Sequence, residues 1–222
     1  MNRESVHNAT TWGPIETGFS PANIANSPRV YHPIGERAPV HVLACDPGFA
    51  AFGFAIVQLT TDGERVVGLG VLRTKRSPAK RGVFASDDAL RRARELALQL
   101  GEILDSHNVI AIAAESMSHV RNSSAAAKVS LAWGVLAALT ARDLPLLQVS
   151  PQGIKKAIVG RPGASKADVQ LKLLQRYGAA TADLLSAVPA SLHEHAYDAL
   201  GALVACLDSE TLRLARTMAG AA

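Results

Sequence analysis

Two short apolar runs in this chain each end directly on a carboxylate, and this feature limits most strongly how the chain can fold. Residues 42–45, VLAC, are followed by Asp46, and residues 109–114, VIAIAA, are followed by Glu115. Uninterrupted apolar runs of this length are typical of strands buried on both faces of a central sheet. A charge at the end of a buried strand costs free energy unless a cation or hydrogen-bond donors meet it. We therefore expect a sheet whose edge carries two acids that share a ligand.

The residues around the first run predict a hairpin with an acid at its lip. Pro47 and Gly48 stop the strand after Asp46, and residues 52–57 predict a second strand that returns from a short turn. Residues 66–72 and 146–149 predict two further strands. An Asp before Pro-Gly also commonly caps the backbone of a turn. The interpretation of Asp46 therefore depends on partners elsewhere in the chain.

A basic segment, RTKRSPAKR, follows the third predicted strand at residues 73–81. Charge runs of this kind are usually solvated loops, but a basic loop broken by proline at a strand end can also bind phosphates. The candidate DNA-binding residues in this segment are Arg73, Lys75, Arg76, Lys80 and Arg81.

Two helices are predicted between the third strand and residue 141. The first begins at Ser86, with Asp87 and Asp88 near the positive end of the helix dipole. Its apolar face is predicted to contain Leu90, Ala93, Ala97, Leu100 and Leu104, with Arg91, Arg92 and Glu95 off that face. The second is an Ala-rich helix over residues 122–141 that carries Lys128 and Trp133.

The C-terminal half predicts four more helices and a linker. Ser150 and Pro151 start a short helix with Lys155 and Lys156, and Ser165 starts another in a capping box with Asp168. Lys166 lies in the first turn of that helix, where a cation opposes the dipole; it is either placed for a function or a chance surface lysine. Residues 179–190 predict a linker, residues 192–207 a helix, and Ser209 and Glu210 the start of a short terminal helix.

The helix over residues 192–207 carries polar groups only at its N-terminal end. His195 and Asp198 are three positions apart and share one face, while the rest of the helix is apolar. The alternative interpretation is an ordinary solvated helix start. Together with Asp46 and Glu115, however, these residues form a mostly oxygen ligand set that suits Mg²⁺ or Mn²⁺ better than zinc. Two such ions about 3.5–4 Å apart could activate water and stabilise the leaving oxygen of a phosphodiester.

The composition sets broad limits on location and partners. The formal charge of +4 over 222 residues permits a polyanionic partner without requiring one. Both cysteines lie in apolar runs without metal-binding spacing, which fits a reducing compartment. Neither a signal peptide nor an apolar run of about 18 residues is apparent, so we expect an intracellular protein with no membrane contact. Residues 1–38, rich in Asn, Thr, Ser and Pro, predict a partly disordered extension of a domain that spans residues 39–222.

Several stretches, taken in order over about residues 40–207, resemble the RuvC family of Holliday junction resolvases, within the RNase H-like superfamily. They are ACDPGFAAFGFAIV, GLGVLRTK, AIAAES, the helix over residues 122–134, IKKAIVG, ASKADVQ and EHAYDALGALVA. The resemblance implies an α/β, RNase H-like fold with a mixed five-stranded sheet flanked by helices. It also implies a homodimer that cuts two symmetric strands of a four-way DNA junction with Mg²⁺.

The resemblance also assigns roles to single residues. Asp46 matches the first-strand catalytic Asp that bridges two Mg²⁺ ions, for which Mn²⁺ would substitute, and Glu115 and Asp198 match the family's later acids. His195 stands where relatives carry Asp or His; a neutral imidazole ligand implies lower activity below about pH 6. Lys155 and Lys166 match basic residues beside the scissile phosphate. The candidate DNA-binding set is completed by Asn122, Lys128 and Lys156, and Lys156 is the fallback for Lys155.

Two features depart from the family pattern. Relatives often carry an aromatic residue just after the catalytic Glu, whereas this chain has Met117, Ser118 and His119, which leaves junction opening and sequence preference open. The long N-terminal extension suggests a phage-borne or divergent member. The expected location is the bacterial cytoplasm, or the host cytoplasm for a phage protein, with branch-migration machinery as a candidate partner.

Three alternatives stay open from the sequence. An RNase H-like nuclease could act on other branched DNA, on flaps or on RNA. Actin-like ATPases and sugar kinases also open with a strand, an acid and a hairpin, but they need a longer chain and a second Gly-rich hairpin. A non-catalytic junction-binding protein is disfavoured because all four acidic-site positions are filled. Magnesium-dependent nicking would separate the last alternative from an enzyme.

Overall fold

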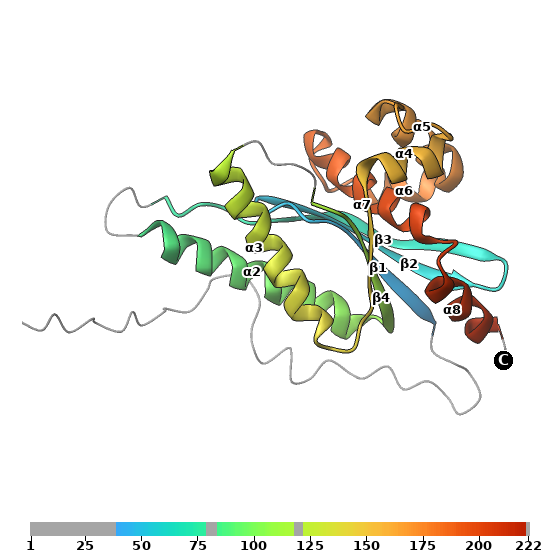
Figure 1. Cartoon of the computed structure of the whole chain (residues 1–222), viewed down its shortest axis with the longest axis horizontal. Helices are drawn as coiled ribbons and strands as arrows, with labels where there is room; N and C mark the ends of the chain where they lie inside the picture. Colours follow the sequence, from blue (N-terminus) through green and yellow to red (C-terminus); the bar gives the residue numbers. More distant parts are fainter. Residues whose placement is uncertain (1–38, 79–83, 118–121, 221–222) are drawn as a thin grey trace, which may run out of the picture. The chain divides into compact units, whose positions relative to one another are not determined.

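The computed structural model describes residues 39–78, 84–117 and 122–220, which form a five-stranded sheet with helices on both faces (Figure 1). The strand order is β3-β2-β1-β4-β5. The strands are β1 (Val40–Asp46), β2 (Ala51–Thr60), β3 (Gly63–Arg73), β4 (Val109–Glu115) and β5 (Leu146–Val149). The first three form an antiparallel meander, while β4 runs parallel to β1 and β5 parallel to β4. The mixed sheet that the family resemblance implies is confirmed; the expected extension over residues 1–38 lies outside the described residues.

One face of the sheet is covered by α2 (Ala85–Ser106) and α3 (Ser123–Thr140), which lie side by side in Figure 1. Successive residues of a strand point to opposite faces. Leu43 and Cys45 of β1 therefore pack in one buried cluster with Leu96 and Leu100 of α2 and Leu136 of α3. Because these side chains are almost fully buried, this layer fixes α2 against the central strands.

The other face is covered by the C-terminal half of the chain (Figure 1). Its elements are α4 (Pro151–Val159), α5 (Lys166–Tyr177), α6 (Ala179–Leu185), the 3₁₀ turn η1 (Ala190–Leu192), α7 (His193–Cys206) and α8 (Glu210–Gly220). Val42 and Ala44 of β1 pack here with Ala113 of β4 and with Leu200 and Leu203 of α7. The helix α7 contacts all five strands, so it is the central element of this layer.

The ends of α4 and α5 follow the predicted capping chemistry. The Ser150 hydroxyl accepts the Gly153 N–H, Pro151 begins α4, and Gly160 ends it in a left-handed conformation (φ 85°). The Ser165 hydroxyl accepts the Asp168 N–H while the Asp168 carboxylate accepts the Ser165 N–H. Both predicted helix starts are confirmed. They determine where Lys155 lies in α4 and where Lys166 lies in α5.

Three predictions about α2 are wrong. The helix begins at Ala85 with Phe84 as an N-cap that has no side-chain hydrogen bond, so Ser86 does not start it. Arg92 does not lie off the apolar face; it is 4% exposed, because its guanidinium finds polar partners and an aromatic ring inside the protein. Leu90, expected on the apolar face, is exposed instead.

The predicted linker over residues 179–190 is also wrong, since it contains α6 and the start of η1. Leu185 is buried in the core, and the buried Thr181 donates its hydroxyl hydrogen to the Gly178 carbonyl. These contacts stabilise a seven-residue helix that is too short to show a clear period in the sequence.

The helix α3 is unusually apolar for its exposure. Its 18 residues have a mean hydropathy of 1.2, but only 22% of the stretch is buried. By length and composition alone, it could cross a membrane, although it is not an uninterrupted apolar run, because it contains Ser123, Ser124, Lys128 and Ser130. A single helix of this kind is weak evidence for a membrane span, because core helices of soluble proteins meet the same criterion.

Candidate active site

The carboxyl ends of four strands meet at one edge of the sheet. In the strand register, Asp46 of β1 lies opposite Gly53, Cys45 pairs with Ala114, and Glu115 pairs with Val149. Because side chains alternate along a strand, Asp46 and Glu115 point to the same face as Ala44 and Ala113, which is the face that α7 covers. The two predicted acids are thus neighbours on the α7 side of the sheet.

The first turn of α7 brings His195 against Asp46. Nδ1 of His195 donates a hydrogen bond to Oδ2 of Asp46 over 2.8 Å. This close approach depends on Gly53: a Cβ atom there would lie 1.9 Å from the carbonyl oxygen of His195 and 2.4 Å from its carbonyl carbon. The missing side chain lets the backbone of α7 touch β2 directly, beside the end of β1.

The next turn of α7 brings Asp198 against Lys166 of α5. The Lys166 ammonium donates to Oδ2 of Asp198 over 2.7 Å and lies 3.5 Å from Oε2 of Glu194. Although burial opposes it, the hydrogen bond from Lys166 and the charge of Asp198 raise the pKa of the amine. Burial raises the pKa of Asp198, and Lys166 partly offsets this effect. Glu194 is the more exposed acid, so the structure favours His195 over Glu194 as the residue beside Asp46.

Glu115 lies at the electrostatic centre of the cluster. Burial, followed by the negative charges of Asp46 and Asp198, raises its pKa to about 7, and the charges of Lys166 and Lys155 act in the opposite direction. These mutual effects require the groups to be close to one another. Side chains from β1, β4, α4, α5 and α7 therefore converge on one site.

The composition of this site fits a hard divalent cation. Three carboxylates and one imidazole are ligands that Mg²⁺ and Mn²⁺ accept. A bound cation would offset the charges of Asp46 and Asp198, which add to burial in raising the pKa of Glu115. As arranged, no three His, Cys, Asp or Glu side chains of the described residues lie close enough to hold one ion. Asp46 is engaged with His195 and Asp198 with Lys166, so metal binding would require these side chains to exchange partners.

The candidate DNA-binding residues are spread over three elements. Arg73, Lys75 and Arg76 are exposed at the end of β3. This end of β3 pairs with the first residue of β2, next to the loop after Asp46. Asn122 is the N-cap of α3, where its side-chain oxygen accepts the Ala125 N–H, and Lys128 is half-buried on that helix. Lys156 is exposed on α4, whereas Lys80 and Arg81 lie outside the described residues.

Sequence reasoning missed two residues that shape this site, Gly53 and Arg92. Gly53 lies within the predicted strand over residues 52–57, but its contact with α7 joins residues too far apart in the sequence to appear as a local pattern. Arg92 had a detectable signal, because it precedes the buried residues Leu96, Leu100 and Leu104 at intervals of four. A charged residue in register with an apolar stripe indicates a buried partner.

A mixed sheet of this order, with acids at the ends of two neighbouring parallel strands and polar groups on a covering helix, defines an RNase H-like nuclease. The family described as crossover junction endodeoxyribonuclease RuvC matches residues 42–201, and the chain belongs to this family. RuvC proteins are metal-dependent endodeoxyribonucleases, so the predicted family and enzyme class are confirmed.

Individual relatives agree with this assignment. The RuvC of Pseudothermotoga lettingae is 28% identical over 130 residues, which cover 58% of this chain and 75% of the relative. The RuvC of Shewanella sediminis is 29% identical over 164 residues, which cover 73% of this chain and 84% of the relative.

Solved structures share the fold. Thermus thermophilus RuvC in complex with a Holliday junction substrate aligns with a TM-score of 0.60 and 23% identity, covering 81% of this chain and 96% of that one. The yeast mitochondrial Holliday junction resolvase Ydc2 aligns with a TM-score of 0.58 and 15% identity, covering 84% and 86%.

Gly53→Ala should displace α7 from β2 and thereby separate His195 from Asp46. The added Cβ would lie 1.9 Å from a backbone oxygen that cannot rotate away. We expect the free energy of unfolding to fall by about 1–3 kcal/mol and DNA cleavage to fall by about 100-fold, the effect of a roughly 1 Å misplacement. Urea denaturation and a cleavage assay measure the two effects.

Gly101→Ala is the matched control, because a Cβ there meets only the Arg142 guanidinium at 3.8 Å. It should leave cleavage unchanged. A Gly53→Ala variant with normal stability and normal cleavage would show that the contact between β2 and α7 is not needed.

Proposed function

We propose that this protein resolves four-way DNA junctions by metal-dependent hydrolysis of one phosphodiester bond in each of two symmetric strands. The observation that carries the proposal is the convergence of Asp46, Glu115, His195 and Asp198 at one edge of the sheet, with pKa effects that couple Glu115 to both aspartates. Membership of the RuvC family supports the substrate class, and the shared fold of a RuvC solved with a Holliday junction is consistent with it.

Asp46, Glu115, His195 and Asp198 are the residues that we propose hold two Mg²⁺ ions, for which Mn²⁺ would substitute. Bound ions would activate the attacking water and stabilise the leaving oxygen. Lys166, and Lys155 through its effect on Glu115, place ammonium groups beside the carboxylates. There they would bind the non-bridging oxygens of the scissile phosphate and stabilise the charge that develops on them.

A wider substrate range is favoured by one observation. Met117, two residues after Glu115, is 52% exposed and flexible in shape, where an aromatic residue would offer a flat stacking surface for a base. We therefore propose three-way junctions and flaps as secondary substrates of the same site.

Asp46→Asn should abolish cleavage and leave binding nearly intact. The substitution removes the anionic ligand, whereas affinity for DNA rests on basic residues that contact phosphates. With Mg²⁺, we expect cleavage of a labelled four-way junction to fall by at least about 100-fold, while the dissociation constant in EDTA changes little. Gel assays with four-way, three-way, flap and RNA–DNA hybrid substrates measure which substrate the unsubstituted protein cleaves fastest.

Each outcome of this panel has a meaning. Normal cleavage by Asp46→Asn would remove Asp46 from the proposed metal site. A preference for hybrids or flaps over four-way junctions would replace resolution by another RNase H-like activity. Junction binding without Mg²⁺-dependent nicking in the unsubstituted protein would indicate a non-catalytic junction-binding protein.

Metal affinity should fall steeply as the pH falls. The hydrogen bond from His195 to Asp46 raises the pKa of His195, and burial beside Asp46 and Asp198 raises that of Glu115 to about 7. Both groups must lose a proton to bind a cation, so protons compete with metal below these pKa values. We therefore expect metal affinity to be lost at a higher pH than the value near 6 that an unperturbed imidazole implies.

Calorimetric titration with Mn²⁺ between about pH 5.5 and 8.5 measures this linkage. The logarithm of the affinity should rise with pH at up to about two units per pH unit where both groups are protonated. Glu115→Gln should weaken metal binding and reduce this slope to about one. A slope near zero in the unsubstituted protein would contradict proton release from this site.

We propose that the protein acts as a homodimer whose interface includes α3. Four small residues recur at intervals of three or four along the exposed side of this apolar helix: Ala127, Ser130, Gly134 and Ala137. A second copy would bury this face and account for its low burial without a membrane. A two-fold dimer also matches two symmetric cuts in one junction.

Gly134→Glu tests the interface. The position has open space for a side chain, so the monomer should fold, but two like charges would meet across a two-fold axis. Sedimentation velocity at micromolar concentration should show a shift from dimer to monomer, with loss of paired cuts. Leu171→Glu, at an exposed apolar position on α5 of the opposite layer, is the control and should remain dimeric. An unchanged dimer in Gly134→Glu would exclude this face.

We further propose a cytoplasmic location, in a bacterium or in the host of a phage, and branch-migration machinery as a partner. Cys45 and Cys206 are buried free thiols, as is usual in a reducing compartment. Machinery that moves the crossover would supply the enzyme with junctions at cleavable positions.

A further inference from the structure

The first turns of α2 are bound to the backbone that follows β3. We name residues 74–77 the strand-end segment. The Ser77 N–H donates to Oδ1 of Asp88 over 2.9 Å, and Nη2 of Arg91 donates to the Lys75 carbonyl. Nη2 of Arg91 also donates to Oδ1 of Asp88 over 2.8 Å, so one carboxylate oxygen joins both contacts. Two polar side chains of α2 thus hold the segment by its backbone.

The other end of the segment is fixed to the loop after Asp46. Thr74 is 6% exposed; its hydroxyl donates to the Phe49 carbonyl over 2.6 Å, and its N–H donates to the Ala50 carbonyl over 3.2 Å. Nε of the buried Arg92 donates to the Thr74 hydroxyl over 3.0 Å, and its guanidinium lies 4.4 Å from the centre of the Phe49 ring. The segment therefore has a fixed position relative to the candidate active site.

Two cations of the segment are left available by this arrangement. Lys75 and Arg76 have exposed side chains, and within the described ranges neither has an ion pair. Asp88 is the nearby acid that could neutralise them, but it is engaged with the Ser77 N–H and with Arg91. The contacts bind the backbone of the segment and leave its charged groups facing solvent.

We propose that Asp88 is a positioning residue for DNA binding: with Arg91, it holds the strand-end segment so that Lys75 and Arg76 meet DNA phosphates. The proposal rests on the DNA binding proposed above. It extends that function by giving a role to an acidic residue. Asp88 itself repels DNA, but it orders two cations that bind DNA. Ordering before binding increases affinity because the segment loses less conformational freedom in the complex.

The sign of the effect separates positioning from simple electrostatics. Removing an acid near a DNA-binding surface ordinarily strengthens binding, because it removes repulsion of the phosphates. Positioning predicts the opposite for Asp88→Ala, since the freed segment no longer presents its cations. Asp88→Asn keeps an oxygen that can accept the Ser77 N–H and removes the same charge, so it should bind better than Asp88→Ala.

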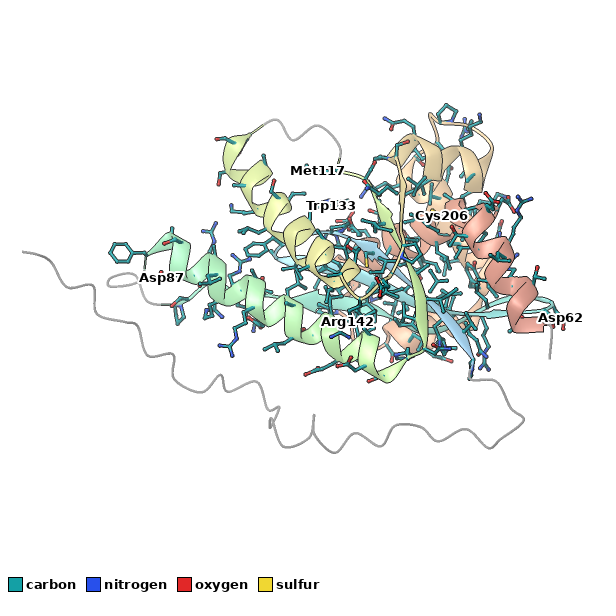
Figure 2. The ribbon with its side chains drawn as sticks, turned by 60° about the horizontal axis from the view of Figure 1, so that its bottom comes forward. Asp62, Asp87, Met117, Trp133, Arg142 and Cys206 are labelled. Atoms are coloured by element: carbon teal, nitrogen blue, oxygen red, sulfur yellow. The ribbon has the colours of Figure 1, made fainter. Side chains whose placement is uncertain are left out.

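Asp87→Ala is the matched control. Asp87, labelled in Figure 2, lies in the same first turn of α2, but its side chain has no polar partner in the part of the chain that the structure describes. The substitution changes the net charge and the helix dipole as Asp88→Ala does. The two variants therefore differ mainly in the contact with the strand-end segment.

Fluorescence anisotropy in EDTA, with a labelled four-way junction and a labelled duplex, measures the dissociation constants over a range of salt concentrations. Asp88→Ala should bind about three- to tenfold more weakly than the unsubstituted protein, the effect of one lost hydrogen bond, with a shallower salt dependence. Asp87→Ala should bind equally or more tightly. Hydrogen exchange of a peptide covering residues 74–78 should increase in Asp88→Ala alone, while thermal unfolding monitors the fold.

The result that overturns the proposal is a dissociation constant for Asp88→Ala equal to or lower than that for Asp87→Ala. Equal weakening by Asp88→Asn and Asp88→Ala would also overturn it, because the oxygen that Asp88→Asn keeps to accept the Ser77 N–H would then make no difference to DNA binding. Failure of junction cleavage is a separate outcome, because the binding measurements with labelled duplex still compare the variants. Only a protein that binds no DNA would contradict both the proposed function and the positioning role of Asp88.

Discussion

The crowding of carboxylates at one edge of the sheet is the constraint on which the rest of this structure depends. Glu115 is half-buried beside Asp46 and Asp198; burial, followed by the negative charges of these two aspartates, raises its pKa to about 7. The chain offsets this charge with its own groups: His195 donates to Asp46, and Lys166 donates to Asp198. Both compensating groups are polar residues at helix starts, which can turn towards a phosphate or a metal without disturbing the buried core.

Small side chains make this crowding sterically possible. Ala44 and Ala113 line the α7 face of the central strands, and α7 itself presents Ala196 and Ala199 as fully buried residues. Gly53 removes the last obstacle where β2 touches the backbone of His195. A helix that packs this closely carries its first turn to the strand ends, so the core composition determines the distance between His195 and Asp46. The same small residues therefore determine both how α7 packs on the sheet and how the site is arranged.

The strands and helix caps could be predicted because they depend on local chemistry. The apolar runs before Asp46 and Glu115 end where β1 and β4 end, and the Ser150 and Ser165 caps lie where hydroxyl acceptors precede helices. The pairing of His195 with Asp46 could not be derived from spacing, because the partners are 149 positions apart; the shared ligand chemistry of the polar residues and the family resemblance indicate it. Arg92 and α6 were misassigned because tertiary contacts outweighed local preference: an internal set of polar partners for one, and burial of Leu185 for the other.

Asp46 and the loop that follows it are contacted from both faces of the sheet, so α2 as well as α7 contributes to the position of this segment. From one face, His195 contacts the carboxylate itself. From the other, Arg92 binds the Phe49 carbonyl and ring, three residues further along the chain. Between these contacts the loop is tight: the Gly48 N–H donates to the Asp46 carbonyl, and a Cβ at position 48 would lie 2.1 Å from the Ala51 carbonyl oxygen. At the proposed metal site, such fixed placement of the backbone would favour cation binding, because only side chains, and not the loop after Asp46, would need to rearrange.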